Sequence, residues 1–275
     1  MDGFSRVEAG SSNHSEDAVT SGLVLIDGHH LYWEGHGPVE APCIILMHHG
    51  LGSVRSWHHQ IPALTQSGFK VIVYDRWGYG RSDIRPKFED NFLLHDADEA
   101  IQLLDDLNIQ RAHFIGHSDG GTIALYFALQ NCHKVSSLVT VAAHIYLEAD
   151  MEPGILEIKS SFKRDTRFRE GMHRVHGEKF GATFNNWFNG WNRPEAEGWD
   201  MRSILSGINC PTLVVQGEED EFASPQHAYD IHRNIPHSSL WLIPGVEHMV
   251  PQEIPTDFNT KVIEFFRTNR EQGSI

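Results

Sequence analysis

Short apolar runs alternate with amphipathic stretches along most of this chain. The apolar runs have the length of strands, and their nearly continuous apolar character is typical of strands buried on both faces of a parallel sheet. They lie at 43–47, 70–74, 112–115, 135–143, 212–215 and 240–243. Stretches with helical spacing lie between and after them, at 56–66, 90–107, 122–129, 225–233 and 256–267. This alternation predicts an α/β fold, with a mostly parallel central sheet and helices on both of its faces.

The N-terminal part of the chain departs from this pattern. Residues 23–26 and 30–33 are two short strand-like runs joined by Asp27-Gly28, a dipeptide typical of tight hairpin turns. We expect this hairpin to form an antiparallel edge of the sheet. Residues 1–20 are rich in serine and acidic side chains, and we expect a flexible polar tail there.

Residues 145–205 also break the alternation, because they contain no strong strand and carry many basic and aromatic residues. We expect them to form a helical lid inserted into an α/β core made of residues 21–144 and 206–275. Five aromatic residues recur there at helical spacing, namely Phe180, Phe184, Trp187, Phe188 and Trp191. Packing of the insertion onto the core is the favoured interpretation of this stripe, and a substrate pocket is the alternative.

The strongest chemical signal lies between the apolar run at 112–115 and the helical stretch at 122–129. Residues 116–120 read Gly-His-Ser-Asp-Gly and match the pattern G-x-S-x-G. A sharp strand-to-helix turn of this kind needs small flanking residues, and the following helix favours an oxyanion at its N-terminus. Ser118 is therefore the candidate nucleophile. Because a serine hydroxyl is a poor nucleophile near neutral pH, it needs a base and an acid that orients that base.

Loop position after a strand is the filter that selects partners for Ser118 from the 19 histidines and many acids of the chain. His248 follows the apolar run at 240–243, and Asp220 follows the run at 212–215. Both side chains are expected at the carboxyl edge of the sheet, where open α/β folds place their sites.

The chain order Ser118, Asp220, His248 is that of the α/β-hydrolase fold. From about residue 21 onward the chain resembles lidded serine esterases of that superfamily. His49-Gly50-Leu51 matches the family's oxyanion segment, and residues 75–82 match its Asp-x-x-Gly-x-Gly-x-Ser loop. The resemblance implies that Ser118 is the nucleophile, Asp220 the acid and His248 the base.

The same resemblance bears on neighbouring residues. Glu218 and Glu219 compete with Asp220 for the acid role, and the family's Gly-x-x-Asp spacing after Gly217 favours Asp220. The backbone amides of Leu51 and Asp119 are implied as the oxyanion donors. His117, just before the nucleophile, is expected to serve packing because the triad already supplies a base.

The implied activity is hydrolysis of a small carboxylic ester by water through an acyl-enzyme on Ser118, without a cofactor. C–C bond hydrolases, lactonases and amidases with the same triad are alternatives, and so is a small-molecule receptor on a hydrolase scaffold. A serine at this turn disfavours haloalkane dehalogenases and epoxide hydrolases, which carry an aspartate there.

Five residues are candidates for contact with the substrate: His49, Asp119, His144, Trp187 and Trp191. The Asp119 side chain has two interpretations. It is favourable as an acid in the first turn of a helix, and it would attract a substrate amine if it faced the acyl pocket.

Composition and charge bear on which classes of partner the protein binds. With 37 acidic and 22 basic residues the formal net charge is −15, which argues against binding of nucleic acid. No apolar run is long enough to span a membrane, and the first 21 residues lack the features of a secretory signal, so we expect no membrane partner. Three cysteines suit reduced thiols and a cytoplasmic location. The residues leave the oligomeric state open.

Three pairs of adjacent histidines raise the question of a metal. They are His29-His30, His48-His49 and His58-His59. Neighbours on a strand point to opposite faces, and neighbours on a helix diverge by about 100°, so a pair does not converge on one ion. We therefore expect no metal site.

Overall fold

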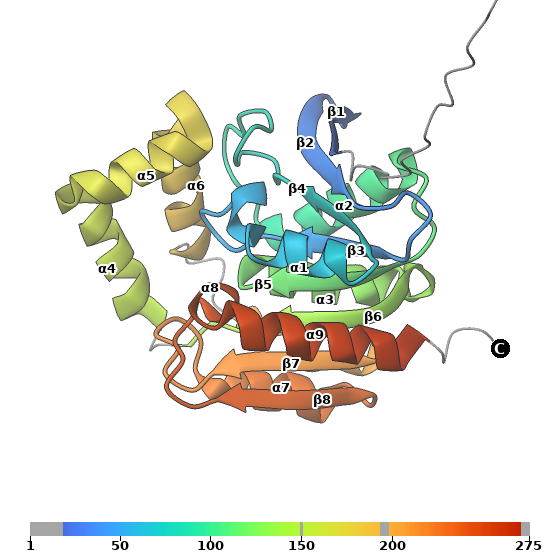
Figure 1. Cartoon of the computed structure of the whole chain (residues 1–275). Coiled ribbons are helices and arrows are strands. Elements are labelled where there is room, and N and C mark those ends of the chain that lie inside the picture. The colour runs from blue at the N-terminus through green and yellow to red at the C-terminus, as the bar shows by residue number, and fades with distance from the viewer. Residues whose placement is uncertain (1–18, 149–150, 193–197, 271–275) are drawn as a thin grey trace, which may run out of the picture.

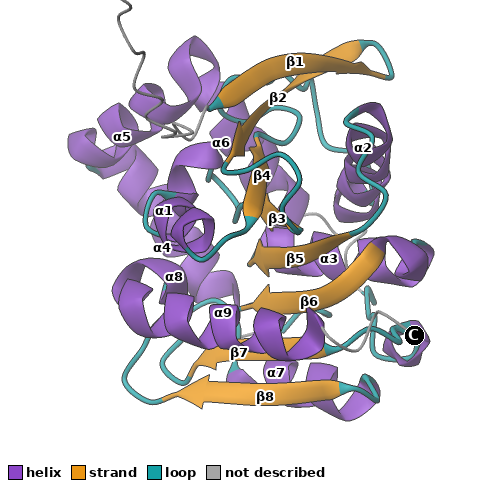
Figure 2. Ribbon diagram, turned by 45° about the vertical axis from the view of Figure 1, so that its right-hand side comes forward, coloured by secondary structure: helices purple, strands orange, loops and turns teal. Residues whose placement is uncertain are grey.

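A computed structural model describes residues 19–148, 151–192 and 198–270. Eight strands form one sheet in the order β1-β2-β4-β3-β5-β6-β7-β8 (Figure 2). Their bounds are β1 Thr20–Ile26, β2 His29–His36, β3 Cys43–Met47, β4 Lys70–Tyr74, β5 Ala112–His117, β6 Val135–Val141, β7 Thr212–Gly217 and β8 Ser238–Ile243. The expected tail at 1–20 lies outside the described residues except for its last two, and Thr20 already belongs to β1.

The sheet is parallel from β4 to β8 and antiparallel at its first edge. β1 pairs antiparallel with β2, and β2 pairs antiparallel with β4. The remaining neighbours pair parallel. Asp27 and Gly28 make the hairpin turn with φ values of 46° and 91°, as a two-residue turn with the twist of its strands requires. The predicted α/β fold and its antiparallel edge are confirmed.

Helices cover both faces of the sheet (Figure 2). α1 Gln60–Gln66 and α9 Pro255–Arg270 lie over one face, where Leu64 and Phe266 join the apolar core. α2 Phe92–Asp106, α3 Asp119–Gln130 and α7 Pro225–Asn234 lie over the other, which holds the second core. The helix expected over 56–66 is split, because Ser53 and Ser56 form a capping box around a short 3-10 helix at Val54–Trp57.

Three further helices lie between β6 and β7, and we call them the inserted helices. They are α4 Met151–Arg164, α5 Thr166–His176 and α6 Phe180–Trp191. In Figure 1 they stand beyond the carboxyl ends of the strands, beside the short helix α8 Val250–Glu253. Part of the aromatic stripe packs within this group, since the rings of Phe162 and Phe184 stack 3.8 Å apart.

No described helix is long and apolar enough to cross a membrane.

Candidate active site

Ser118 stands at the sharp turn between β5 and α3. Its φ of 56° and ψ of −120° are strained for a residue with a side chain. A Cβ on Gly116 would overlap the Gly120 backbone, and one on Gly120 would overlap the Met47 carbonyl, so both positions require glycine. The sequence pattern G-x-S-x-G thus has a steric cause, and the turn brings Ser118 to the carboxyl edge of the sheet.

Asp220 and His248 meet at the same edge, in the loops after β7 and β8. The His248 Nδ1 lies 2.8 Å from Asp220 Oδ2 and 2.9 Å from Oδ1. The Asp220 carboxylate also accepts from the backbone amides of Phe222 and Ala223 and from the side chain of Gln216. Its side chain is fully buried, whereas Glu218 and Glu219 are exposed. Of the three acids considered, the structure brings Asp220 to the histidine.

Asp220 and His248 each stabilise the charged form of the other, and their pKa values shift accordingly. Burial alone would lower the pKa of His248, but the Asp220 charge and hydrogen bond outweigh it and raise that pKa above its ordinary value. Burial alone would raise the pKa of Asp220, but His248 and the backbone donors outweigh it and lower that pKa. Asp220 is therefore an anion beside the imidazole, and the neutral ring donates from Nδ1–H and carries no proton on Nε2.

The oxyanion segment forms a tight turn between β3 and the Val54–Trp57 helix. The Gly52 amide donates to the His49 carbonyl at 3.1 Å, and Leu51 adopts a φ of 59°. The Leu51 amide has no acceptor among the described residues. His176, from α5, donates to the Leu51 carbonyl at 3.0 Å. A backbone donor is thus available at this turn, and an inserted helix contacts the same residue.

The Asp119 carboxylate is held in a buried ion pair. Arg76 Nη2 donates to its Oδ2 at 3.2 Å, and the Trp191 indole donates to its Oδ1 at 3.2 Å. Arg76 also pairs with a second acid, Asp96, which in turn binds Arg85. Burial raises the pKa of Asp119, and Arg76 opposes that shift. Both donors to the Asp119 carboxylate are side chains from outside α3.

These groups face one cavity of about 390 Å³. Ser118, Asp119, Leu51 and His248 line it from the sheet side, and all four other substrate-contact candidates, His49, His144, Trp187 and Trp191, line it as well. The inserted helices supply an apolar wall of Met151, Ile155, Ile158, Phe168 and Met172. The two indoles are 7% and 8% exposed, so they belong both to the packed core and to the cavity wall.

A family model described as the alpha/beta hydrolase fold matches residues 42–195. The chain belongs to the α/β-hydrolase family. Serine hydrolase BPHL of Mus musculus is 29% identical over 91% of this chain and 87% of its own length. The 2-hydroxy-6-oxo-6-phenylhexa-2,4-dienoate hydrolase of Comamonas testosteroni is 24% identical over 83% of this chain and 88% of its own. The enol-lactonase structure from Burkholderia xenovorans LB400 superposes with a TM-score of 0.73, at 21% identity, over 90% and 100% of the two chains. The protein is a hydrolase of this superfamily.

Two histidines near the site make long-range contacts that the sequence did not predict. His117, expected to serve packing, donates from Nε2 to the His248 carbonyl at 2.9 Å and so supports the loop that carries His248. His144 donates from Nε2 to the Phe222 carbonyl at 3.0 Å. These contacts join residues 131 and 78 positions apart, and no local pattern signals them.

In two of the three pairs, the two adjacent histidine side chains contact different partners. His48 accepts from the Arg76 amide, while His49 donates to the Gly50 carbonyl and accepts from Ser56. His30 lies against Asp83, on the opposite side of the strand from its neighbour. His58 and His59 depart from expectation, because they lie in a turn rather than a helix and their rings are 3.9 Å apart on the surface.

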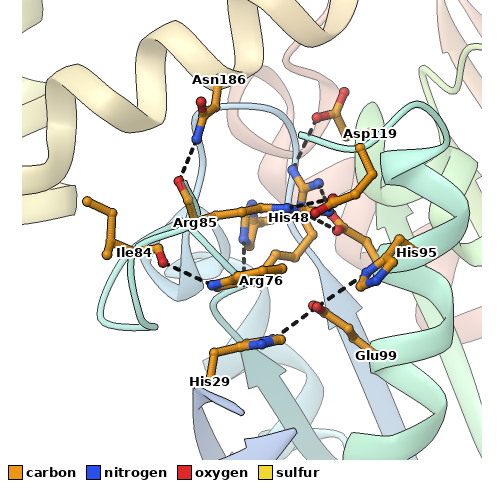
Figure 3. Close-up of polar contacts among 12 residues, drawn as sticks. His29, His48, Arg76, Ile84, Arg85, His95, Glu99, Asp119 and Asn186 are labelled. Carbon is orange, nitrogen blue, oxygen red and sulfur yellow. Dashed lines mark hydrogen bonds and ion pairs between the residues drawn. The ribbon is translucent and has the colours of Figure 1, made fainter. Parts of the chain in front are cut away.

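One group of possible metal ligands lies elsewhere, on α2. His95, Asp96 and Glu99 offer ligand atoms within 4.8 Å of one another. Both Asp96 oxygens accept from buried arginines, and Figure 3 shows the Glu99 carboxyl placed between the rings of His95 and His29. Burial, followed by the Asp96 charge, raises the pKa of Glu99 to about 9. Because both Asp96 oxygens are already engaged by arginines, only His95 and Glu99 remain to offer ligands, and we assign the group no metal.

Proposed function

We propose that this hydrolase cleaves a small carboxylic ester through an acyl-enzyme on Ser118. The observation that carries the proposal is that His248, held by Asp220 at 2.8 Å, lines the same cavity as a serine on a strained turn. His248 removes the Ser118 proton as the hydroxyl attacks the ester carbonyl, and it then protonates the leaving alcohol. Water, activated by the same imidazole, releases the acid. Asp220 holds the tautomer that leaves Nε2 free to act.

The tetrahedral intermediate needs donors for its oxyanion. We assign that role to the backbone amides of Leu51 and Asp119, two residues that line the cavity with Ser118. Each such donor is typically worth about 3 kcal/mol of transition-state stabilisation. The free Leu51 amide and the N-terminus of α3 at Asp119 support this assignment.

The lining of the cavity supports an apolar, uncharged or amine-bearing substrate. Its volume of about 390 Å³ suits a small molecule, and most of its wall is apolar. Among the residues that the structure describes, no lysine or arginine lines it, while Asp119 and Glu221 do. A substrate carboxylate would therefore meet acids without a direct cationic partner.

This charge distribution weighs against one alternative. The Comamonas testosteroni relative is named for a dienoate, which is a carboxylate. A C–C bond hydrolase for such an anion needs a cationic contact that this cavity does not offer within its described lining. Lactones and amides remain compatible with the same groups and are therefore included in the test.

The test begins with a fluorophosphonate probe and p-nitrophenyl acetate. Ser118 should be labelled rapidly, many turnovers should follow, and Ser118→Ala should lower kcat by about 10⁴ or more while the fold persists. A single turnover in the wild-type protein would favour the receptor alternative, and near-wild-type turnover in the variant would refute the nucleophile assignment. A panel of esters, lactones and amides varied in acyl size and charge then identifies the bond that is cleaved.

A further inference from the structure

His176 ends the inserted helix α5 and reaches the core between two loops of the site. Its Nδ1 accepts from the Gly80 amide at 2.9 Å, and its Nε2 lies 3.0 Å from the Leu51 carbonyl. A backbone amide can only donate, so Nδ1 is the unprotonated nitrogen and Nε2 carries the hydrogen. The side chain is 2% exposed, and both ring nitrogens are used.

The hydrogen bond from His176 to the Leu51 carbonyl restrains a residue whose backbone conformation is unfavourable. A non-glycine residue with φ near 60° typically carries about 1–3 kcal/mol of strain and persists only where its surroundings impose it. Release of the carbonyl would let Leu51 relax toward negative φ. That rotation would turn the Leu51 amide, the proposed oxyanion donor, away from the cavity.

Asp119, whose backbone amide is the second proposed oxyanion donor, is also contacted by an inserted helix. Trp191, from α6, donates to the Asp119 carboxylate. A Cβ on Gly50 would overlap the indole of Trp187, so this helix also lies directly against the oxyanion turn. Both donor residues are therefore contacted by the inserted helices, one through its carbonyl and one through its side chain.

We propose that His176 is a positioning residue of the oxyanion hole, which fixes the Leu51 amide by holding the Leu51 carbonyl from α5. The inference rests on the proposed function, because an oxyanion forms only if Ser118 attacks a carbonyl. It adds a role for the inserted helices: the donor set is complete only while α5 is in place.

Two substitutions separate the two hydrogen bonds of His176. In His176→Asn the amide oxygen falls near the Nδ1 position, so the Gly80 bond is kept and the Leu51 bond is lost. In His176→Gln the amide nitrogen falls near the Nε2 position, so the Leu51 bond is kept. We expect the Asn variant to lose about tenfold or more in kcat, with KM within about threefold, since full removal of an oxyanion donor costs about 10²–10³. The Gln variant should retain most of kcat.

A third variant controls for loosening of the inserted helices alone. Thr183→Val removes a buried hydrogen bond of 2.7 Å from α6 to the Gly78 carbonyl, a bond that involves neither Leu51 nor His176. Its kcat should stay at the wild-type value. Binding of a trifluoromethyl ketone, whose adduct with Ser118 places an oxyanion in the hole, should weaken in the Asn variant in proportion to kcat.

Equal losses in the Asn and Gln variants, a loss confined to KM, or an equal loss in Thr183→Val would each overturn the proposal. If the Asn variant does not fold, His176→Ala with added imidazole replaces it. Imidazole should restore kcat, whereas 1-methylimidazole, which cannot both accept and donate, should not, and rescue by both compounds would count against us. Wild-type turnover and its loss in Ser118→Ala are measured first, so failure of the ester hydrolase proposal is detected separately.

Discussion

Lowering the pH should destabilise this protein well above the acid range in which carboxylates titrate. The cause is a set of buried histidines near the cavity, of which His49, His144 and His176 each have a pKa of about 4 because burial disfavours the charged ring. In the unfolded chain a histidine titrates near 6.5. Their contribution to stability is thus fully present above pH 6.5 and is lost as the pH falls from 6.5 toward 4.

The size of the effect follows from linkage. Between pH 6.5 and 5 each of these three histidines removes about 1.6 kcal/mol of stability, or about 5 kcal/mol together. Glu99 acts in the opposite sense, because its folded pKa of about 9 exceeds the unfolded value, and it returns about 2 kcal/mol between pH 6.5 and 5. The raised pKa of His248 adds no change below 6.5. The net loss of about 3 kcal/mol is a large share of the 5–15 kcal/mol that stabilises a typical domain.

Other buried groups change the size of this net loss of stability but not its sign. His48, His117 and His227 also have pKa values lowered by burial, and they add to the loss. The pKa values of Asp75 and Asp119 are raised by burial, so these carboxyls act with Glu99 at lower pH. The buried histidines named here outnumber the carboxyls, so the protein still loses stability as the pH falls.

Urea unfolding followed by tryptophan fluorescence at pH 7.5, 6.5, 5.5 and 5.0 measures the effect. The free energy of unfolding should fall steeply between pH 6.5 and 5.0 at constant m-value. His144→Gln should reduce the slope by about one proton, about 1.4 kcal/mol per pH unit, and His58→Gln, at an exposed position, is the control substitution. A free energy that is flat or rises over this range would refute the reasoning.

Two predictions concern the charged groups of the site. Asp220→Asn should lower kcat by about 10⁴ through the wrong imidazole tautomer, whereas Glu218→Gln and Glu219→Gln should have little effect; a damaging glutamate variant in the same ester assay would overturn the acid assignment. Asp119→Asn should narrow the preference for alanine ethyl ester over monoethyl succinate, because a carboxylate about 5 Å from the reacting carbonyl contributes about 1–3 kcal/mol and its loss leaves Arg76 less compensated. An unchanged ratio of kcat/KM at moderate salt would show that the Asp119 charge does not act on the substrate.

The elements that the sequence predicted best are those with a local signal. The continuous apolar runs became β3 to β8, and Asp27-Gly28 gave the hairpin, because strand burial and turn chemistry depend on neighbours in the chain. The placement of Asp220 and His248 at one edge followed from the same rule, since both come directly after parallel strands. Boundaries were less accurate: the helix expected to start at residue 56 begins at Gln60, because the Ser53–Ser56 capping box favours a separate short turn.

Contacts between the inserted helices and the core had no such signal. His176 and Leu51 are 125 positions apart, and Trp191 and Asp119 are 72 apart. Their meeting depends on the path of α4 to α6 over the carboxyl edge, and an aromatic stripe fixes neither that path nor its register. The same holds for the Arg76–Asp119 pair, which decides how much charge the cavity presents.

The abundance of histidine, which first suggested a metal, has a different physical explanation in this fold. A neutral imidazole offers one donor and one acceptor on a rigid ring, so it can satisfy a carbonyl and an amide of two loops at once. His176 does so for Leu51 and Gly80, and His48 does so by donating to the His49 carbonyl while accepting from the Arg76 amide. The loops at the carboxyl edge must expose backbone donors to a substrate, so they cannot pair their own groups as a strand does. Buried neutral rings supply the missing partners without adding charge to the cavity. Protonation of such a ring removes the acceptor that its backbone amide needs and buries a charge, so stability is lost at the same time.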